Sequence, residues 1–431
     1  MPSDSSATTV DWRDNAANGN WENGTGVCNE IGEPASQWWY DGWSPNRARN
    51  RPDCFSTTRH LRFDNNHQTT MTLNASWYNA GAVQFSANAT TARTINGANG
   101  LDLRSANHGI TNNSSANHTW NVQIAFNANP THFRLNSGNM TFNSNIYFKA
   151  NWLEVWGNNG HTLNLNGPLL RDGGDGGLAV KQNTLVIATN NANTITGAIW
   201  VEKGVVRLGG GTNAMGNSGA INVGTNATLE LNYSNGEVLR NSTLNLYGIG
   251  TNGQGSLKKI STSGNVTLPG TVVLQQNAAI RSDGGFLILS NVVSGSPVLS
   301  KVGTGTLQLS GANTYSGVTR ISNGVVRITH GSGLGNASAN TVVSSGAALE
   351  VIGGITSTEP LNIAGTGISS AGSINSVSGN NTLSGTIALA ANSSIGVAAN
   401  SLTASGIISG GFTLTKAAGG TLILTGNNTY S

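Results

Sequence analysis

A long internal repeat constrains the fold of this chain more than any other feature of its sequence. Short segments in its middle return 115 to 120 residues later, and the shift drifts by only a few residues. Such recurrence indicates stacked repeats, because each copy buries its apolar surface against its neighbours. The matched segments are 204–208 with 324–328, 215–217 with 334–336, 229–231 with 349–351, 248–250 with 365–367, 255–257 with 372–374 and 264–268 with 379–383.

A shorter motif closes each unit of the repeat. One copy covers 301–317, a second covers 416–431, and a weaker third copy covers 181–197. The second copy lacks its last glycine, so we expect the native protein to be longer than this chain, or truncated or cleaved. The motif positions are Gly305, Thr306, Leu307, Asn313, Thr314, Tyr315 and Gly317 in the first copy, and Gly420, Thr421, Leu422, Asn428, Thr429 and Tyr430 in the second.

Segments inside each unit alternate polar and apolar residues. Residues 306–309, 228–231 and 243–246 read Thr-Leu-Gln-Leu, Thr-Leu-Glu-Leu and Thr-Leu-Asn-Leu. A period of two places one face of a strand in a core and the other in water. Turn-forming Gly, Asn and Ser bound each run, and no segment shows a helical period. We therefore predict an all-β parallel β-helix (β-solenoid) with almost no helix, about 20–25 residues per coil and hydrogen-bonded ladders of stacked Asn.

The composition excludes several other classes of protein. Charged residues make up 10% of the chain and the formal net charge is +3. A nucleic-acid partner is therefore not expected, because it would need a clustered basic face. No apolar stretch approaches the length of a transmembrane helix. The opening residues lack the apolar core of a signal peptide, so the chain is either cytosolic or a mature or trimmed form. Because the rest of the composition is typical of extracellular proteins, we expect a mature extracellular or cell-surface form.

Residues 1–60 differ from the rest of the chain. They contain both cysteines, Cys28 and Cys54, and five of the ten tryptophans. We interpret 1–60 as a cap on the open end of the solenoid, clipped by a Cys28–Cys54 disulfide, with two unpaired thiols as the alternative. Its aromatic run fits three roles, namely a small core of the cap, a subunit contact or a glycan-binding surface. The run consists of Trp38, Trp39, Tyr40 and Trp43.

The motif resembles the autotransporter-associated β-strand repeat, also called the passenger-associated transport repeat. The family pattern Lys-x-Gly-x-Gly-Thr-Leu-x-Leu-Ser-Gly-x-Asn-Thr-Tyr-Ser-Gly matches 301–317 almost throughout, is cut short at 416–431 and is weak at 181–208. The resemblance implies a right-handed β-helix passenger that bacteria secrete and display on, or release from, the cell surface. It associates the repeat with export and folding of the passenger, and not with catalytic chemistry.

No constellation of residues in the sequence favours catalysis. The seven histidines lack metal-ligand spacing, and no serine stands out with triad partners. Asp172 and Asp175, the only close acids in the middle of the chain, lie in a glycine-rich stretch that we interpret as a solvated turn rather than a calcium loop or a catalytic pair. We therefore expect no catalytic residue, no metal and no cofactor.

Three functions stay open. The first is a non-enzymatic extracellular structural protein of the surface or of fibres, whose rods self-associate. The second is an adhesin passenger that binds glycans or cell surfaces through its N-terminal aromatic residues. The third, ranked last for want of paired acids, is a polysaccharide-degrading enzyme. The expected organisation is a cap at 1–60, a first solenoid segment at 61–180 and repeat units at 181–300 and 301–431.

Overall fold

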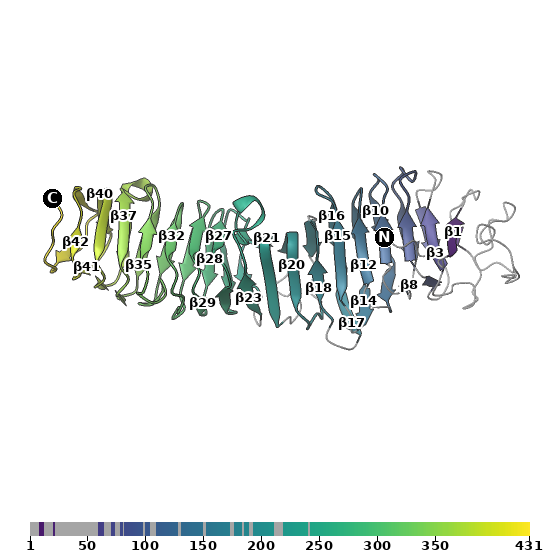
Figure 1. Cartoon of the computed structure of the whole chain (residues 1–431), viewed down its shortest axis with the longest axis horizontal. Coiled ribbons are helices and arrows are strands. Elements are labelled where there is room, and N and C mark those ends of the chain that lie inside the picture. The colour runs from purple at the N-terminus through teal and green to yellow at the C-terminus, as the bar shows by residue number, and fades with distance from the viewer. Residues whose placement is uncertain are drawn as a thin grey trace, which may run out of the picture. The chain divides into compact units, whose positions relative to one another are not determined.

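The computed structural model shows a parallel β-solenoid, in which each strand pairs with its counterpart in the next coil (Figure 1). Within the described residues the helical segments are single 3-10 turns, η3 (Thr251–Gly253) and η4 (Ile368–Ser370), so the all-β prediction is confirmed. None of the described helices is long and apolar enough to cross a membrane. The structure describes residues 8–12, 20–21, 59–63, 70–73, 78–80, 82–97, 100–103, 109–127, 131–149, 152–172, 176–182, 185–188, 193–210, 219–239 and 242–431.

The chain divides into two compact units, Met1–Ser218 (unit one) and Gly219–Ser431 (unit two). The described residues of unit one form three parallel ladders. The first consists of β1 (Thr8–Trp12), β3 (Arg59–Phe63), β6 (Ala82–Phe85), β9 (Gly109–Asn112), β12 (Thr131–Leu135), β15 (Leu153–Gly157), β18 (Leu178–Val180) and the start of β20 (Ile199–Gly209). The second consists of β2 (Asn20–Trp21), β4 (Thr70–Leu73), β7 (Thr94–Gly97), β10 (His118–Trp120), β13 (Met140–Phe142), β16 (Thr162–Leu165), β19 (Leu185–Ala188) and the end of β20. The third consists of β5 (Tyr78–Ala80), β8 (Gly100–Leu103), β11 (Gln123–Phe126), β14 (Ile146–Lys149) and β17 (Leu169–Asp172).

Unit two has three faces, which the chain visits in the order A, B, C. Face A consists of the end of β21 (Ala220–Asn232), β24 (Leu257–Lys259), β27 (Ala278–Ser282), β30 (Leu299–Val302), β32 (Thr319–Ile321), β34 (Thr341–Val343), β37 (Leu361–Gly365), the start of β40 (Ile387–Val397) and β42 (Ile408–Ser409). Face B consists of β22 (Gly236–Glu237), β25 (Asn265–Leu268), β28 (Phe286–Leu289), β31 (Thr306–Leu309), β33 (Val325–Ile328), β35 (Ala348–Ile352), β38 (Ile374–Ser378), the end of β40 and β43 (Leu414–Ala417). Face C consists of the start of β21, β23 (Thr243–Leu246), β26 (Val272–Leu274), β29 (Val293–Gly295), β36 (Thr356–Ser357), β39 (Asn381–Leu383), β41 (Ser401–Ala404) and β44 (Thr421–Leu424).

The spacing of paired residues gives the length of a coil. Along face A, Leu257 pairs with Ile280, Ile280 with Lys301 and Lys301 with Ile321. These steps of 20 to 23 residues agree with the predicted coil of about 20–25 residues. Because the side chains in such a ladder point the same way, one buried position recurs in every coil and builds a continuous core.

The predicted alternation holds in β31, where Leu307 and Leu309 are fully buried and Thr306 and Gln308 are partly exposed. It fails at the end of β21, where Thr228 and Glu230 are also buried. Thr228 is buried because the segment that contains Thr251 and Gly255 packs against it. The Thr228 hydroxyl donates to the carbonyl oxygen of Gly255 (3.0 Å) and accepts from the Thr251 N–H (3.0 Å).

The predicted Asn ladder is present on the surface of unit one. Four asparagines in successive coils bond side chain to side chain, each Nδ2 donating to the Oδ1 of the preceding one. The bonds run from Asn121 to Asn96 (2.7 Å), from Asn143 to Asn121 (2.8 Å) and from Asn166 to Asn143 (2.8 Å). The ladder therefore satisfies these amides along the coil axis in addition to the backbone bonds.

The N-terminal region differs from the prediction. β1 pairs in parallel with β3, and β2 with β4, so two strands inside the predicted cap belong to the solenoid ladders. The solenoid thus reaches upstream of residue 61. The predicted disulfide pair and aromatic run lie outside the described residues, namely Cys28, Cys54, Trp38, Trp39, Tyr40 and Trp43. The repeat boundaries at 180 and 300 stay predictions, since the division into units falls between them at Ser218.

Candidate functional site

Lys301, the first residue of the motif, occupies a core position of face A. Ile280 and Ile321 hold the same position in the neighbouring coils, and all three side chains are fully buried. The ammonium group extends to the turn that leads from face A to face B. Its Nζ donates to the carbonyl oxygens of Val302 (2.9 Å), Gly303 (2.7 Å) and Asn323 (3.1 Å). Because Asn323 lies in the next coil, this one side chain ties two successive turns together.

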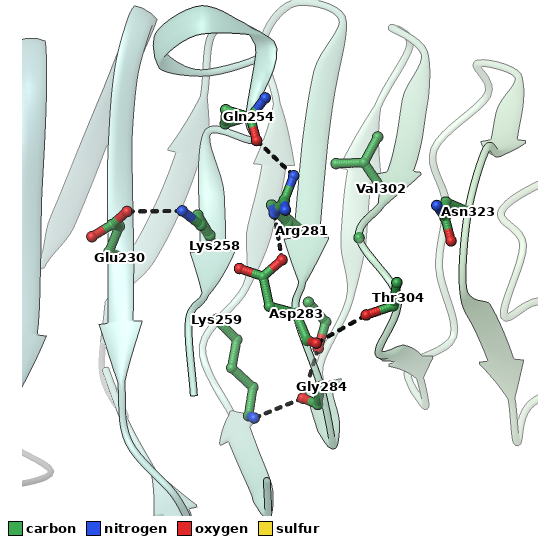
Figure 2. Close-up of polar contacts among 12 residues, drawn as sticks. Glu230, Gln254, Lys258, Lys259, Arg281, Asp283, Gly284, Val302, Thr304 and Asn323 are labelled. Atoms are coloured by element: carbon green, nitrogen blue, oxygen red, sulfur yellow. Dashed lines mark hydrogen bonds and ion pairs between the residues drawn. The ribbon is translucent and has the colours of Figure 1, made fainter. Parts of the chain in front are cut away.

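Lys259 forms the same arrangement two coils earlier, outside the motif. It is also fully buried, and Figure 2 shows its Nζ at the carbonyl of Gly284 in the next coil. Burial lowers the pKa of both lysines, and lowers that of Lys301 to about 7, with nearby Asp283 opposing the shift. Its three acceptors are the carbonyl oxygens of Ser261 (2.6 Å), Ser263 (2.9 Å) and Gly284 (2.8 Å).

The motif asparagine bonds to the preceding coil in all three copies. In each copy, one residue of the preceding coil forms two bonds with the motif. Its backbone N–H donates to the Oδ1 of the motif asparagine, and its carbonyl oxygen accepts the N–H of the threonine that follows this asparagine. In the first copy Asn313 Nδ2 also donates to the Gly333 carbonyl (2.7 Å) in the next coil. The weak third copy therefore has the same local geometry as the others. The partners are Asn193 and Thr194 with Leu169, Asn313 and Thr314 with Val293, and Asn428 and Thr429 with Ile408.

The motif tyrosine, Tyr315, is fully buried next to a short chain of hydroxyl and carboxyl groups. Its hydroxyl is 2.7 Å from the Thr319 hydroxyl, and burial raises its pKa. Thr319 pairs with Thr341, which donates to Glu359 Oε1 at 2.8 Å. Burial raises the pKa of Glu359 to about 7, partly offset by the bond from Thr341. Within the described residues, Glu359 Oε2 has no hydrogen-bond partner.

Two motif glycines lie where neighbouring coils approach closely. A Cβ at Gly305 would meet the Gly284 nitrogen and the Ser282 hydroxyl at 2.7 Å, and one at Gly317 would meet the Pro297 carbonyl at 1.9 Å. No side chain fits at such distances, so these positions require glycine for steric reasons.

The motif positions do not converge on a cleft. Thr306 and Leu307 lie in β31 on face B, and Asn313, Thr314 and Tyr315 follow on face C. Each of the buried polar groups bonds within its own coil or to an adjacent coil. The second copy begins at the end of β43 and continues through and beyond β44, and its side chains are half-buried or exposed. Within the described part of the chain, no three His, Cys, Asp or Glu side chains gather as a metal site. Asp175 lies outside the described residues.

Charged side chains form a short stripe on the outer surface of face A (Figure 2). Lys258 bonds Glu230 of the preceding coil at 3.1 Å. Arg281 bonds Asp283 and also donates to Gln254 Oε1 at 2.6 Å. The Lys258–Glu230 pair and the Arg281–Gln254 bond link neighbouring coils, whereas Arg281 and Asp283 belong to one coil, and the two ion pairs leave little net charge.

Two outward loops share one backbone conformation. Loop one (247–256) contains η3 and loop two (364–373) contains η4, which follows 117 residues later. Equivalent bonds close them, from the Gly255 N–H to the Ile249 carbonyl (2.8 Å) and from the Gly372 N–H to the Thr366 carbonyl (2.9 Å). Positive φ angles recur at equivalent residues, 53° at Asn252 with 51° at Ser369, and 70° at Gly253 with 58° at Ser370.

The sequence missed two features of unit two. Lys259 follows Lys258, and two adjacent lysines are typical of a solvated strand end rather than of one outward and one buried residue. The alternation of the strand could have predicted that Lys259 is buried, because Lys259 is two residues from the buried Leu257 and therefore lies on the same side of the strand. The repeat alignment matched the sequences of the two loops, but it did not predict that both loops project outward with the same backbone conformation.

These observations define a class, the parallel β-solenoid held together by a lysine, asparagine and tyrosine motif. Two segments, 299–328 and 414–431, match the family described as the passenger-associated-transport-repeat. The resemblance to this repeat is thereby confirmed. No curated protein and no solved structure is significantly similar to the chain.

Proposed function

We propose that the protein is a non-enzymatic structural β-solenoid that bacteria secrete or display on the cell surface as an autotransporter-type passenger, and whose copies self-associate. The repeat match and the solenoid support a passenger. One observation carries the structural role. The motif side chains Lys301, Asn313 and Tyr315 are buried, and their polar groups bond to atoms of their own and adjacent coils.

The low charge of the chain supports self-association. At 10% charged residues, neighbouring molecules meet little electrostatic repulsion. We expect sedimentation velocity and negative-stain electron microscopy over a concentration series to show rods that join into larger assemblies. A monodisperse monomer at the highest concentration would contradict self-association. Release of reducing sugars from common polysaccharides would contradict the non-enzymatic role.

The aromatic run in the N-terminal region favours a second function, glycan binding. Exposed tryptophans stack on sugar rings. A glycan array probed with the intact chain and with a Trp38→Ala/Trp39→Ala/Trp43→Ala variant tests it. Binding that is lost in the triple variant and kept in Trp200→Ala, a partly exposed tryptophan in β20, supports an adhesin. Equal signals from both variants would contradict it.

A further inference from the structure

In unit two, equivalent elements of two repeat copies lie on different faces of the solenoid. Five ladder steps along face A lead from Leu257 to Ile363, through Ile280, Lys301, Ile321 and Val343. The repeat counterpart of Leu257 is not Ile363 but Ile374, which lies in β38 on face B. One repeat therefore covers five complete coils and then the further step from face A to face B.

Other repeat pairs show the same turn. Lys301 lies on face A in β30, whereas its counterpart Lys416 lies on face B in β43. β31 lies on face B, and its counterpart β44 lies on face C. Loop one joins face C to face A, between β23 and β24, and loop two joins face A to face B, between β37 and β38. The two loops thus project from adjacent edges of unit two.

The loops keep one backbone shape although their side chains differ. Residues 250–255 read Gly-Thr-Asn-Gly-Gln-Gly and 367–372 read Gly-Ile-Ser-Ser-Ala-Gly. Loop two holds Ser369 and Ser370 at positive φ, which is unfavourable for residues other than glycine. Strained backbone of this kind concentrates at contact and functional sites. The shared feature of the two loops is therefore their shape.

Each loop also presents one apolar side chain to solvent, at different positions of the shared backbone, since Ile249 corresponds to Thr366 and Ile368 to Thr251. Ile249 is 50% exposed and Ile368 is 37% exposed. Neither loop contains a charged residue. Arg281, which donates to Gln254 of loop one, is paired with Asp283, so two copies of the same neutral loop meet without strong repulsion.

We propose that loops one and two are a duplicated contact element through which a second copy of this chain associates side by side. The inference rests on the proposed self-association and names the surface that performs it. Each loop meets the same loop of a neighbouring molecule in a two-fold contact. Because the loops project from adjacent edges, one molecule contacts two neighbours, and the assembly continues to grow instead of closing as a dimer.

Ile249→Asp and Ile368→Asp, alone and combined, test this proposal. An aspartate in place of either exposed isoleucine places like charges in the contact while the core stays intact. Ile407→Asp is the matched control, because Ile407 is 45% exposed and lies outside both loops. Circular dichroism and thermal unfolding check that each variant keeps the fold. Assembly is followed by sedimentation velocity and electron microscopy.

We expect each single variant to stop at dimers and the double variant to remain monomeric, at concentrations at least about tenfold above those at which the wild type and Ile407→Asp assemble. If the wild type assembles and the double variant assembles equally well, the loops are not the contact, although self-association stands. If the wild type is monomeric at every concentration, self-association fails and this inference fails with it.

Discussion

At the scale of the residue, unit two uses lysine as a core side chain. Both Lys259 and Lys301 are fully buried: Lys301 lies between Ile280 and Ile321 in its ladder, and Lys259 lies between Leu231 and Ser282. The cost of burying an ammonium is offset by three carbonyl acceptors, one of which belongs to the next coil. A carbonyl-bound lysine therefore contributes mainly to the bond between coils.

Lys301→Met is expected to destabilise unit two by about 2–4 kcal/mol, because three buried carbonyl groups lose a charged donor. Urea unfolding followed by circular dichroism measures the change. Lys416→Met is the matched control, since the second-copy lysine bonds one carbonyl, that of Ala418, and is exposed. Its expected effect is within about 0.5 kcal/mol. Equal losses in the two variants would contradict the structural role of the buried ammonium.

At the scale of the element, loops one and two keep the same backbone conformation although only loop one has glycine at a position that favours glycine. Loop one places Gly253 where φ is 70°, and loop two places Ser370 at 58° in the equivalent position. Glycine adopts this region freely, whereas an L-residue is strained there. Closing hydrogen bonds hold the serine in place.

Exchanging these residues between the loops gives opposite effects. Ser370→Gly is expected to stabilise unit two by about 0.5–1 kcal/mol, and Gly253→Ser to destabilise it by a similar amount. Denaturant midpoints measure both. Ser405→Gly, at an exposed serine without a positive φ, should lose stability because glycine adds flexibility to the unfolded chain. A loss in Ser370→Gly as large as in Ser405→Gly would show that loop two carries no strain.

At the scale of the whole molecule, the two units respond to pH in opposite directions. In unit one, burial lowers the pKa of His118 to about 3, with a smaller contribution from the charge of Arg93. The imidazole ring stacks on the Phe85 ring, with 3.7 Å between the ring centroids. Its unfolded state binds a proton below about 6.5, so stability rises with pH between 3 and 6.5. In unit two, the raised pKa of Glu359 means that the folded state binds the extra proton. Stability from this group is complete below about 4.5 and is lost as pH rises through 7.

Hydrogen exchange at pH 4.5 and 7 should separate these responses, because it reports each unit by itself. After correction for intrinsic exchange, unit one is expected to gain protection with rising pH and unit two to lose it, each by an amount on the order of 3 kcal/mol. Glu359→Gln should remove the change in unit two, and His118→Phe the change in unit one. Glu350→Gln, an ion-pair partner of Arg327 on face B, should retain the wild-type response. Parallel responses of the two units would contradict these assignments.

The sequence predicted the fold from period-two segments such as 306–309, and it predicted which residues recur. It could not predict the turn of the repeat from face to face, because coils along face A vary from 20 to 28 residues. A shift of 117 residues therefore does not reveal a fractional number of coils. Glu359 was also hidden, since a glutamate followed by Pro360 is typical of an exposed turn. Only the packed coils show that it is buried.

The turn of one face per repeat has a geometric consequence for design. Joined end to end, three copies of this repeat would cover sixteen coils and return each element to its starting face. The repeat thus acts as a three-fold screw operation, with an axial period of roughly 77 Å if successive coils are about 4.8 Å apart. A ligand grafted onto the same loop of every repeat in such an array would appear at each of the three edges in turn, at a spacing of roughly 26 Å along the axis.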